Sequence, residues 1–140
     1  MSPDQIQRIR SSFARLLPMA EPAAALFYAN LFREDPSLQS MFRGNMVEQG
    51  AKLMQMIGGA VGLLDKPQLL TPVLRNLGRR HRGYGVRPAH YATVGAALMK
   101  TLEQGLGEAF DEATRSAWAA MYRLVSDLMI EASSDETVAA

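Results

Sequence analysis

Two histidines could bring metal-ligand or proton-transfer chemistry to this chain, and both lie in the segment LGRRHRGYGVRPAHY. His81 belongs to a helical apolar stripe, which we expect to be buried, made of Leu70, Val73, Leu74, Leu77, His81 and Tyr84. A neutral imidazole on an apolar helix face is a common protein ligand of haem iron, provided that one ring nitrogen is free. The competing interpretation is a hydrogen-bonded core or helix-terminal histidine. His90 follows Pro88 in the first turn of the next expected helix, and we interpret it as a surface or rim residue.

Three further side chains suit a ligand site on other segments. Tyr28 lies in the apolar segment FYANLF, where a buried phenol needs a partner for its hydroxyl group. Gln49 heads the apolar stripe that continues with Leu53 and Met56, and burying an amide is costly unless its hydrogen bonds are satisfied. Each has an alternative: Tyr28 as a half-buried core residue pointing to water, and Gln49 as an exposed residue ahead of the stripe. Phe42 could stack on a flat ligand or serve as core packing.

Helical patterns cover nearly the whole chain, and no segment shows the two-residue alternation of a half-buried β-strand. Prolines, Asp35 and Asp111 provide helix starts, while Gly83, Gly85 and Gly107 provide helix ends. The expected helices cover residues 3 to about 18, 22 to about 32, 36 to about 42, 49 to 64, 67 to about 83, 88 to 107 and 111 to about 132. We therefore expect an all-α domain of six or seven helices that positions His81 near the end of one helix.

Size and composition exclude several classes of protein. The chain has 140 residues, of which 48% are hydrophobic, and this suffices for one core, so we expect one domain over residues 1–132 and a polar tail over 133–140. The net charge of +1 gives no footprint for nucleic acid or an anionic membrane. The absence of cysteine excludes disulfides, thiolate-ligated haem and iron–sulfur clusters. Without a secretory signal or an apolar run of membrane-spanning length, we expect a cytoplasmic location.

From about Gln5 to Glu131 the chain resembles the bacterial single-domain globins that are related to flavohaemoglobins. FYANLFREDPSLQSMF is similar to the second and third helices of that family, and EQGAKLMQMIGGAV is similar to its distal helix. LGRRHRGYGVRPAHYATVGAALMKTL is similar to its proximal helix and the helix that follows. The resemblance implies a globin fold around haem b, bound without a covalent link.

The resemblance also assigns roles to single positions. It places the oxygen-facing tyrosine and glutamine on Tyr28 and Gln49, which would be the catalytic residues, and their apolar companion on Leu53. It places the iron ligand on His81 and that ligand's tyrosine neighbour on Tyr91. The remaining cofactor contacts that we expect are a stacking ring at Phe42, a propionate partner at Arg80, and an apolar wall completed by Leu77, Val86, Val94 and Leu98.

One position departs from the family. The glutamate that acts on the proximal pair in flavohaemoglobins falls on Ser133 here, and Glu131 lies two residues away, where about 100° per residue turns it to another face. Whether either residue replaces the acid stays open.

The resemblance implies tight binding of O2 and NO, with slow release because two donors face the bound ligand. We hypothesise oxidation of nitric oxide to nitrate, which requires an external electron-donating reductase, since the chain ends where the flavin and nicotinamide domains of flavohaemoglobins would begin. The alternatives are a non-enzymatic oxygen-binding, storage or sensing globin and, more remotely, a haem-free helical interaction module. We expect a monomer or a weak homodimer.

Overall fold

The computed structural model describes the backbone of residues 1–139 and the side chains of residues 1–133. Over this range the chain is helical and holds no β-strand. The α-helices are α1 (Pro3–Leu16), α2 (Ala20–Glu34), α3 (Met46–Gly62), α4 (Pro67–Gly83), α5 (Pro88–Leu106) and α6 (Glu112–Ala139). The 3₁₀ helices are η1 (Leu17–Met19), η2 (Pro36–Met41) and η3 (Gly107–Ala109). The expected all-α class is confirmed, and the short helix expected near residues 36–42 is the 3₁₀ helix η2.

Side-chain caps set the starts of α1 and α3. The hydroxyl oxygen of Ser2 accepts a hydrogen bond from the backbone N–H of Gln5 at 3.1 Å, at the start of α1. The side-chain oxygen of Asn45 accepts from two backbone N–H groups in the first turn of α3. That helix therefore begins at Met46, ahead of the start that the apolar stripe indicates at Gln49.

The last helix is longer than its apolar pattern indicates. We expected it to end near Ala132, but α6 continues to Ala139. The segment SSDETVAA holds neither glycine nor proline, so nothing in it interrupts the hydrogen bonding of a helix that has already formed. The division into a domain and a polar tail stays a prediction, because the side chains after Ser133 lie outside the described residues.

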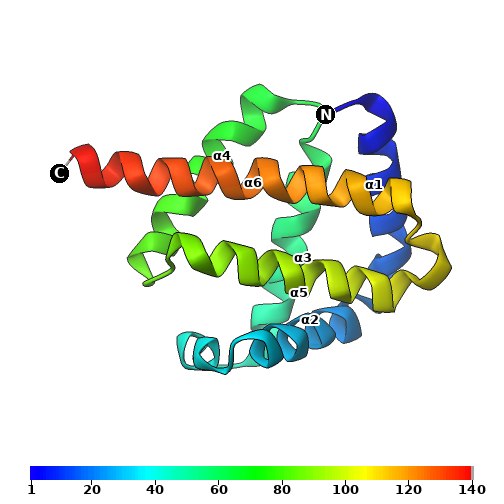
Figure 1. Ribbon diagram of the computed structural model, residues 1–140, viewed down its shortest axis with the longest axis horizontal. Coiled ribbons are helices and arrows are strands. Elements are labelled where there is room, and N and C mark those ends of the chain that lie inside the picture. The colour runs from blue at the N-terminus through cyan, green and yellow to red at the C-terminus, as the bar shows by residue number, and fades with distance from the viewer. Residues whose placement is uncertain (140) are drawn as a thin grey trace.

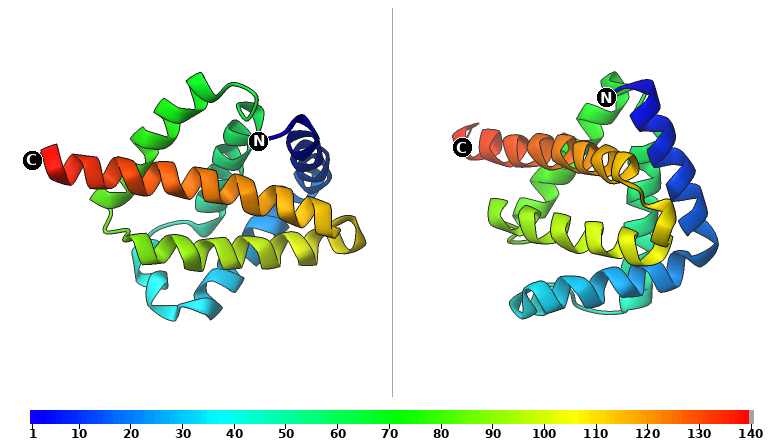
Figure 2. Two further views of the ribbon diagram at one scale, coloured as in Figure 1. Left: turned by 45° about the horizontal axis from the view of Figure 1, so that its top comes forward. Right: turned by 45° about the vertical axis from the view of Figure 1, so that its right-hand side comes forward.

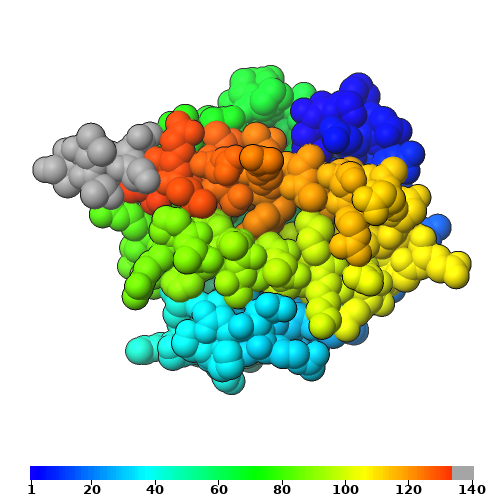
Figure 3. Space-filling model, viewed as in Figure 1, coloured from blue at the N-terminus to red at the C-terminus, as the bar shows by residue number. Residues whose placement is uncertain are grey.

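The helices form two crossing layers. α2, α5 and α6 lie side by side with their axes roughly aligned, and α1, α3 and α4 cross behind them (Figures 1 and 2). On the outer face, α6, α5 and α2 follow one another as three bands of the surface (Figure 3). α4 packs chiefly on α6, whereas α2 packs chiefly on α5 and α3. No described helix combines the length and the apolar content that crossing a bilayer requires.

Two glycines allow the closest of these crossings. A Cβ atom built at Gly78 would lie 2.3 Å from the carbonyl oxygen of Met129, so α4 approaches the backbone of α6 directly. A Cβ atom at Gly50 would lie 2.9 Å from the Cβ of Ala24, where α3 crosses α2. As a result α3 and α4 are each held by a different neighbour, and the direct contact between them is slight.

Polar side chains in the core are paired across helices. The indole N–H of Trp118, the largest fully buried side chain, donates to the hydroxyl oxygen of Ser12 at 2.8 Å. The amide of the buried Asn30 donates to the hydroxyl oxygen of Thr101 at 3.0 Å and to the side-chain oxygen of Gln104 at 2.9 Å. The second pairing fixes α2 against α5, which sets the position of Tyr28 relative to the residues of α5.

Part of the expected stripe on α4 is exposed. Leu70, Leu74 and Gly78, four residues apart, form the face that is buried against α6. Val73 is 54% exposed, because about 100° of rotation per residue carries it off that face. Tyr84 is 75% exposed, because it follows the last residue of the helix, where the periodicity ends.

Candidate functional site

The ring of His81 is held in one tautomer by its own helix. Its Nδ1 lies 2.9 Å from the carbonyl oxygen of Leu77, one turn earlier in α4. A carbonyl oxygen can only accept, so Nδ1 carries the hydrogen and donates it. Burial lowers the pKa of His81, against the smaller opposing effect of that hydrogen bond, which favours the neutral ring. The lone pair of the neutral ring then lies on Nε2, which makes no hydrogen bond within the described residues.

The turn after α4 holds Val86 beside the histidine. The backbone N–H of Val86 donates to the carbonyl oxygen of His81 at 3.0 Å, and the N–H of Gly85 donates to that of Arg82 at 3.0 Å. Gly85 has a φ of +90°, which glycine adopts without strain. Val86 is therefore fixed next to the end of α4, partly buried, while the Arg80 side chain is exposed.

Tyr28, in the second half of α2, lies in a cluster of aromatic rings. Its ring centroid is 5.2 Å from that of Phe42 in an edge-on arrangement and 6.0 Å from that of Phe32 in a stacked one. Its hydroxyl donates to the main-chain carbonyl oxygen of Gln49 at 3.3 Å. Burial raises the pKa of Tyr28, so the phenol keeps its proton and remains a donor at neutral pH. The structure thus brings Tyr28, Phe42 and Gln49 together from three separate elements.

The side chain of Gln49 is free within the described part of the chain. It is partly buried, and its amide makes no hydrogen bond to the described residues. Sequence reasoning paired Tyr28 with the amide of Gln49 as two donors, whereas the contact that the structure holds is to the main chain of Gln49. The amide is consequently available to another group on the same side of α3.

The tyrosine expected beside the iron ligand is fixed from α6. The main-chain carbonyl of Tyr91 accepts a hydrogen bond from the hydroxyl of Tyr122. The Tyr122 ring lies against Gly95, where a Cβ atom would come within 2.7 Å of it. Burial raises the pKa of Tyr91 and, more strongly, that of Tyr122. Sequence reasoning missed Tyr122, and the only available signal was a glycine in the middle of the apolar helix at position 95.

Glu131 pairs with an arginine and not with His81. Its carboxylate pairs with the guanidinium of Arg75 at 3.3 Å, and 57% of the Glu131 side chain is exposed. The hydroxyl of Ser133 donates to the carbonyl of Ile130 at 2.8 Å. Within the described residues, His81 is oriented by the hydrogen bond that it donates to the main-chain carbonyl of Leu77, and not by a bond to a carboxylate.

Comparison with known proteins decides the family. Residues 25–129 of the chain match the family description "Globin". The chain is a globin. It is 33% identical over 131 residues to a neuroglobin of Tetraodon nigroviridis, covering 84% of this chain and 82% of that protein. It is 30% identical over 134 residues to a flavohaemoprotein of Bordetella parapertussis, covering 93% of this chain but 33% of that protein. The globin thus spans about a third of the flavohaemoproteins that it resembles.

Solved structures agree with this assignment. A bacterial globin from Campylobacter jejuni superposes with a TM-score of 0.84 at 27% identity, covering 97% of this chain and 99% of the other. A candidate nitric oxide dioxygenase from Rhodothermus marinus, engineered as a carbene transferase, superposes with a TM-score of 0.87 at 23% identity, covering 99% and 97%. This chain is therefore a globin related to bacterial globins and to the globin domains of flavohaemoproteins, and its fold is the globin fold that we expected.

The globin family implies a haem cofactor, and the side chains present fit one. The apolar and aromatic residues expected around haem are each only partly buried: Phe42, Leu53, Leu77, Val86, Tyr91, Val94 and Leu98. They come from the end of η2, from α3, α4 and α5 and from the turn after α4, and α3 and α4 make little contact with each other. A flat apolar group would cover these surfaces, and burial of apolar area stabilises by roughly 25 cal/mol per Å².

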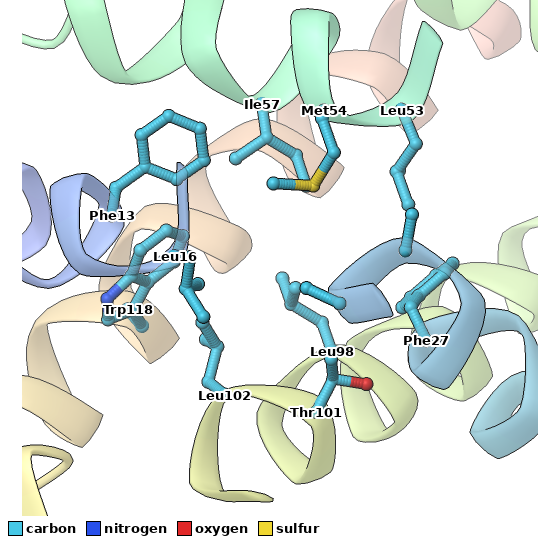
Figure 4. A pocket seen from close by; sticks show the side chains of 12 residues that line it. Phe13, Leu16, Phe27, Leu53, Met54, Ile57, Leu98, Thr101, Leu102 and Trp118 are labelled. Carbon is cyan, nitrogen blue, oxygen red and sulfur yellow. The ribbon is translucent and has the colours of Figure 1, made fainter. Parts of the chain in front are cut away.

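A small internal cavity lies behind Leu53 and Leu98. Its volume is about 20 Å³, and its walls are almost entirely apolar. Leu53 enters from α3 above it and Leu98 from α5 below it, while Phe13 and Trp118 close its far end (Figure 4). Sequence reasoning missed this cavity, because it arises where five helices fail to fill the space between them. The space behind the expected haem wall is therefore not completely filled by side chains.

Proposed function

We propose that this globin binds O2 and NO at ferrous haem b and oxidises nitric oxide to nitrate, with electrons from a separate reductase. The reaction balances as one NO, one O2 and one electron giving one nitrate ion. The observation that carries the proposal is the neutral ring of His81, whose free Nε2 and main-chain anchor at Leu77 O provide an oriented ligand for iron.

The residues of the proximal side would hold and orient the cofactor. When bound, haem supplies reversible binding of diatomic ligands and one-electron redox chemistry. His81 would hold the iron through Nε2, and the hydrogen bond to Leu77 would keep the ring from rotating. The exposed guanidinium of Arg80 would pair with a propionate, and partly buried Val86 would provide an apolar contact to the cofactor.

The residues of the distal side would act on the ligand. Tyr28 stays protonated because burial raises its pKa, so its hydroxyl can leave the carbonyl oxygen of Gln49 and donate to a partly charged ligand. The amide of Gln49 provides a second donor. A hydrogen bond to a charged acceptor contributes about 1.5–3 kcal/mol, which slows release of oxygen and leaves time for a second substrate to arrive.

The proposal also covers how haem is held, the oligomeric state and the kinship of this globin. Haem b would be held without a covalent bond, because the chain has no cysteine to form a thioether. The globin would act as a monomer or a weak homodimer. The segments LFYANLF and LGRRH also resemble those of the thermostable globin of an acidophilic methanotroph, and we propose close kinship with that protein.

Binding and storage of oxygen without turnover is the second candidate. It is favoured by the 33% identity to a neuroglobin over most of both chains. The two functions share the site and differ in whether nitric oxide is consumed repeatedly.

Stopped-flow mixing of the oxygen-loaded ferrous globin with nitric oxide tests the proposal. We expect one nitrate ion per haem and ferric protein within the mixing experiment, followed by further turnovers when a reductant is supplied. Slow reaction, or ferric protein without nitrate, would exclude the dioxygenase and leave the oxygen-binding function.

A further inference from the structure

The charges of this globin are segregated along the chain. The segment from Lys66 to Leu102 holds seven of the 15 basic residues and none of the 14 acidic ones. The rest of the chain holds eight basic and 14 acidic residues, so a net charge of +1 conceals a positive segment within an acidic remainder. A positive segment that is also gathered in space attracts acidic partners as they approach.

The positive segment is densest next to the expected iron ligand. Arg79 and Arg82 stand on the last turns of α4, and Arg87 stands at the start of α5, all exposed. Tyr84, between them, is 75% exposed. Together with Arg80, these residues form what we call the arginine rim, at the turn between α4 and α5 (Figure 1, left end).

The turn of the arginine rim is fixed by hydrogen bonds, and the side chains of residues 1–133 neutralise the rim only lightly. Hydrogen bonds from the backbone of Tyr84, Gly85 and Val86 to carbonyl oxygens of α4 fix the turn. Glu131, on the neighbouring α6, is paired with Arg75, one turn before the rim. Within the described residues, the guanidinium of Arg82 meets only the main-chain carbonyl of Ser133, which carries no full charge.

We propose that the arginine rim is the docking surface for an acidic electron-carrier protein, which would reduce the cofactor that His81 would hold. This rests on the proposed function, because a globin that consumes nitric oxide repeatedly needs one electron for each nitrate formed. A positive surface that continues into the helix of the iron ligand combines electrostatic steering with a short route to the metal. The acidic remainder of the molecule repels the same carrier, so it is turned toward the rim.

A nucleic acid or an anionic membrane is a poorer occupant. Both present extended negative surfaces, which would also face the acidic remainder of this globin. A small acidic protein matches the size of a rim that spans one helix end and one turn.

The test measures reduction of the haem-loaded ferric globin under carbon monoxide, where the ferrous complex traps the product. Reduced flavodoxin serves as the acidic protein donor, and hexaammineruthenium(II) serves as a small cationic donor. With flavodoxin, we expect the rate constant to fall about tenfold between about 20 and about 200 mM salt. With flavodoxin at low salt, the triple variant R79Q/R82Q/R87Q should also react about tenfold more slowly than the parent. With the cationic donor, the triple variant should react no more slowly than the parent.

A matched control removes the same charge elsewhere. The variant R15Q/R33Q/R123Q should keep most of the parent's rate with flavodoxin, because its three exposed arginines lie outside the rim. Equal losses in the two triple variants, or a parent rate that does not depend on salt, would overturn the docking surface. So would binding of the globin to phosphatidylglycerol vesicles through the same arginines with no effect on flavodoxin.

The visible absorption spectrum reports haem uptake, and together with the nitrate assay it distinguishes failure of the docking surface from failure of the proposed function. A parent chain that takes up no haem overturns both. A chain that takes up haem and yields nitrate, but shows neither salt nor rim dependence, overturns the docking surface alone. If the rim variant fails to fold, the salt dependence of the parent still decides the question.

Discussion

The hydroxyl of Tyr28 donates a hydrogen bond to the main-chain carbonyl of Gln49 across a distance of 3.3 Å. This contact joins the end of α2 to the first turn of α3, and it keeps a protonated phenol within reach of the amide on the same residue. The donor that we assign to a bound ligand is thereby held in place before any ligand arrives.

Tyr28→Phe should spare haem uptake and accelerate loss of oxygen. Removing a hydrogen bond to a charged acceptor costs about 1.5–3 kcal/mol, which corresponds to roughly 10- to 150-fold in the dissociation rate. Oxygen dissociation is measured by stopped-flow displacement with carbon monoxide. Phe32→Leu is the matched control, since Phe32 stacks on Tyr28 but has no hydroxyl. Equal dissociation rates in Tyr28→Phe and the parent would refute the distal assignment.

His81→Ala should abolish stable haem binding, because no other described side chain presents a neutral imidazole with a free Nε2 on the same helix. Haem retention is followed by the Soret band during transfer to apomyoglobin. His90→Ala is the matched control, because the His90 ring accepts a hydrogen bond from the backbone of Arg87 and caps α5. If only the His90 variant lost haem, the assignment of the iron ligand to His81 would be wrong.

The haem-free protein should lose stability as the pH falls below about 6.5, the ordinary pKa of histidine. Burial lowers the pKa of His81 in the folded state, so the unfolded chain takes up the proton first. The loss builds up between the unfolded and the folded pKa and levels off below both, whereas above about 6.5 the effect is absent.

Urea unfolding at pH 7.5 and pH 5.5 measures this effect. His81→Gln should reduce the difference in unfolding free energy between the two pH values, and His90→Gln provides the matched comparison. An identical pH dependence in the parent and in His81→Gln would contradict the assignment.

Gly78→Ala should destabilise the fold by about 1–3 kcal/mol, because the new methyl group overlaps the backbone of Met129 and must push α4 away from α6. Gly59→Ala is the matched control, since nothing lies within 4 Å of a Cβ built there. The control should stabilise the exposed helix by about 0.5–1 kcal/mol. Chemical denaturation measures the unfolding free energy of both variants. Equal changes in the two variants would show that α4 and α6 are not in tight contact.

Local features of the sequence were enough to predict most of the fold. Helix starts depend on residues within one turn, so Pro3 and Asp111 located the starts of α1 and α6 without any tertiary information. Apolar periodicity likewise placed His81 near the end of a helix, one turn after Leu77. The predicted end of α6, near Ala132, was wrong. A polar segment without glycine or proline can continue a helix beyond its last apolar contact.

What the sequence determined by itself was an all-helical domain with an imidazole, a phenol and an amide on separate helices. Only the tertiary structure decided that Tyr28 bonds the main chain of Gln49, that Glu131 turns to Arg75, and that Tyr122 fixes the backbone of Tyr91. These partners lie 21 or more residues apart in the chain. Helical periodicity reports which face of a helix is buried, but the choice of neighbour depends on how closely two helices approach, and that is set by side-chain volumes at their crossings.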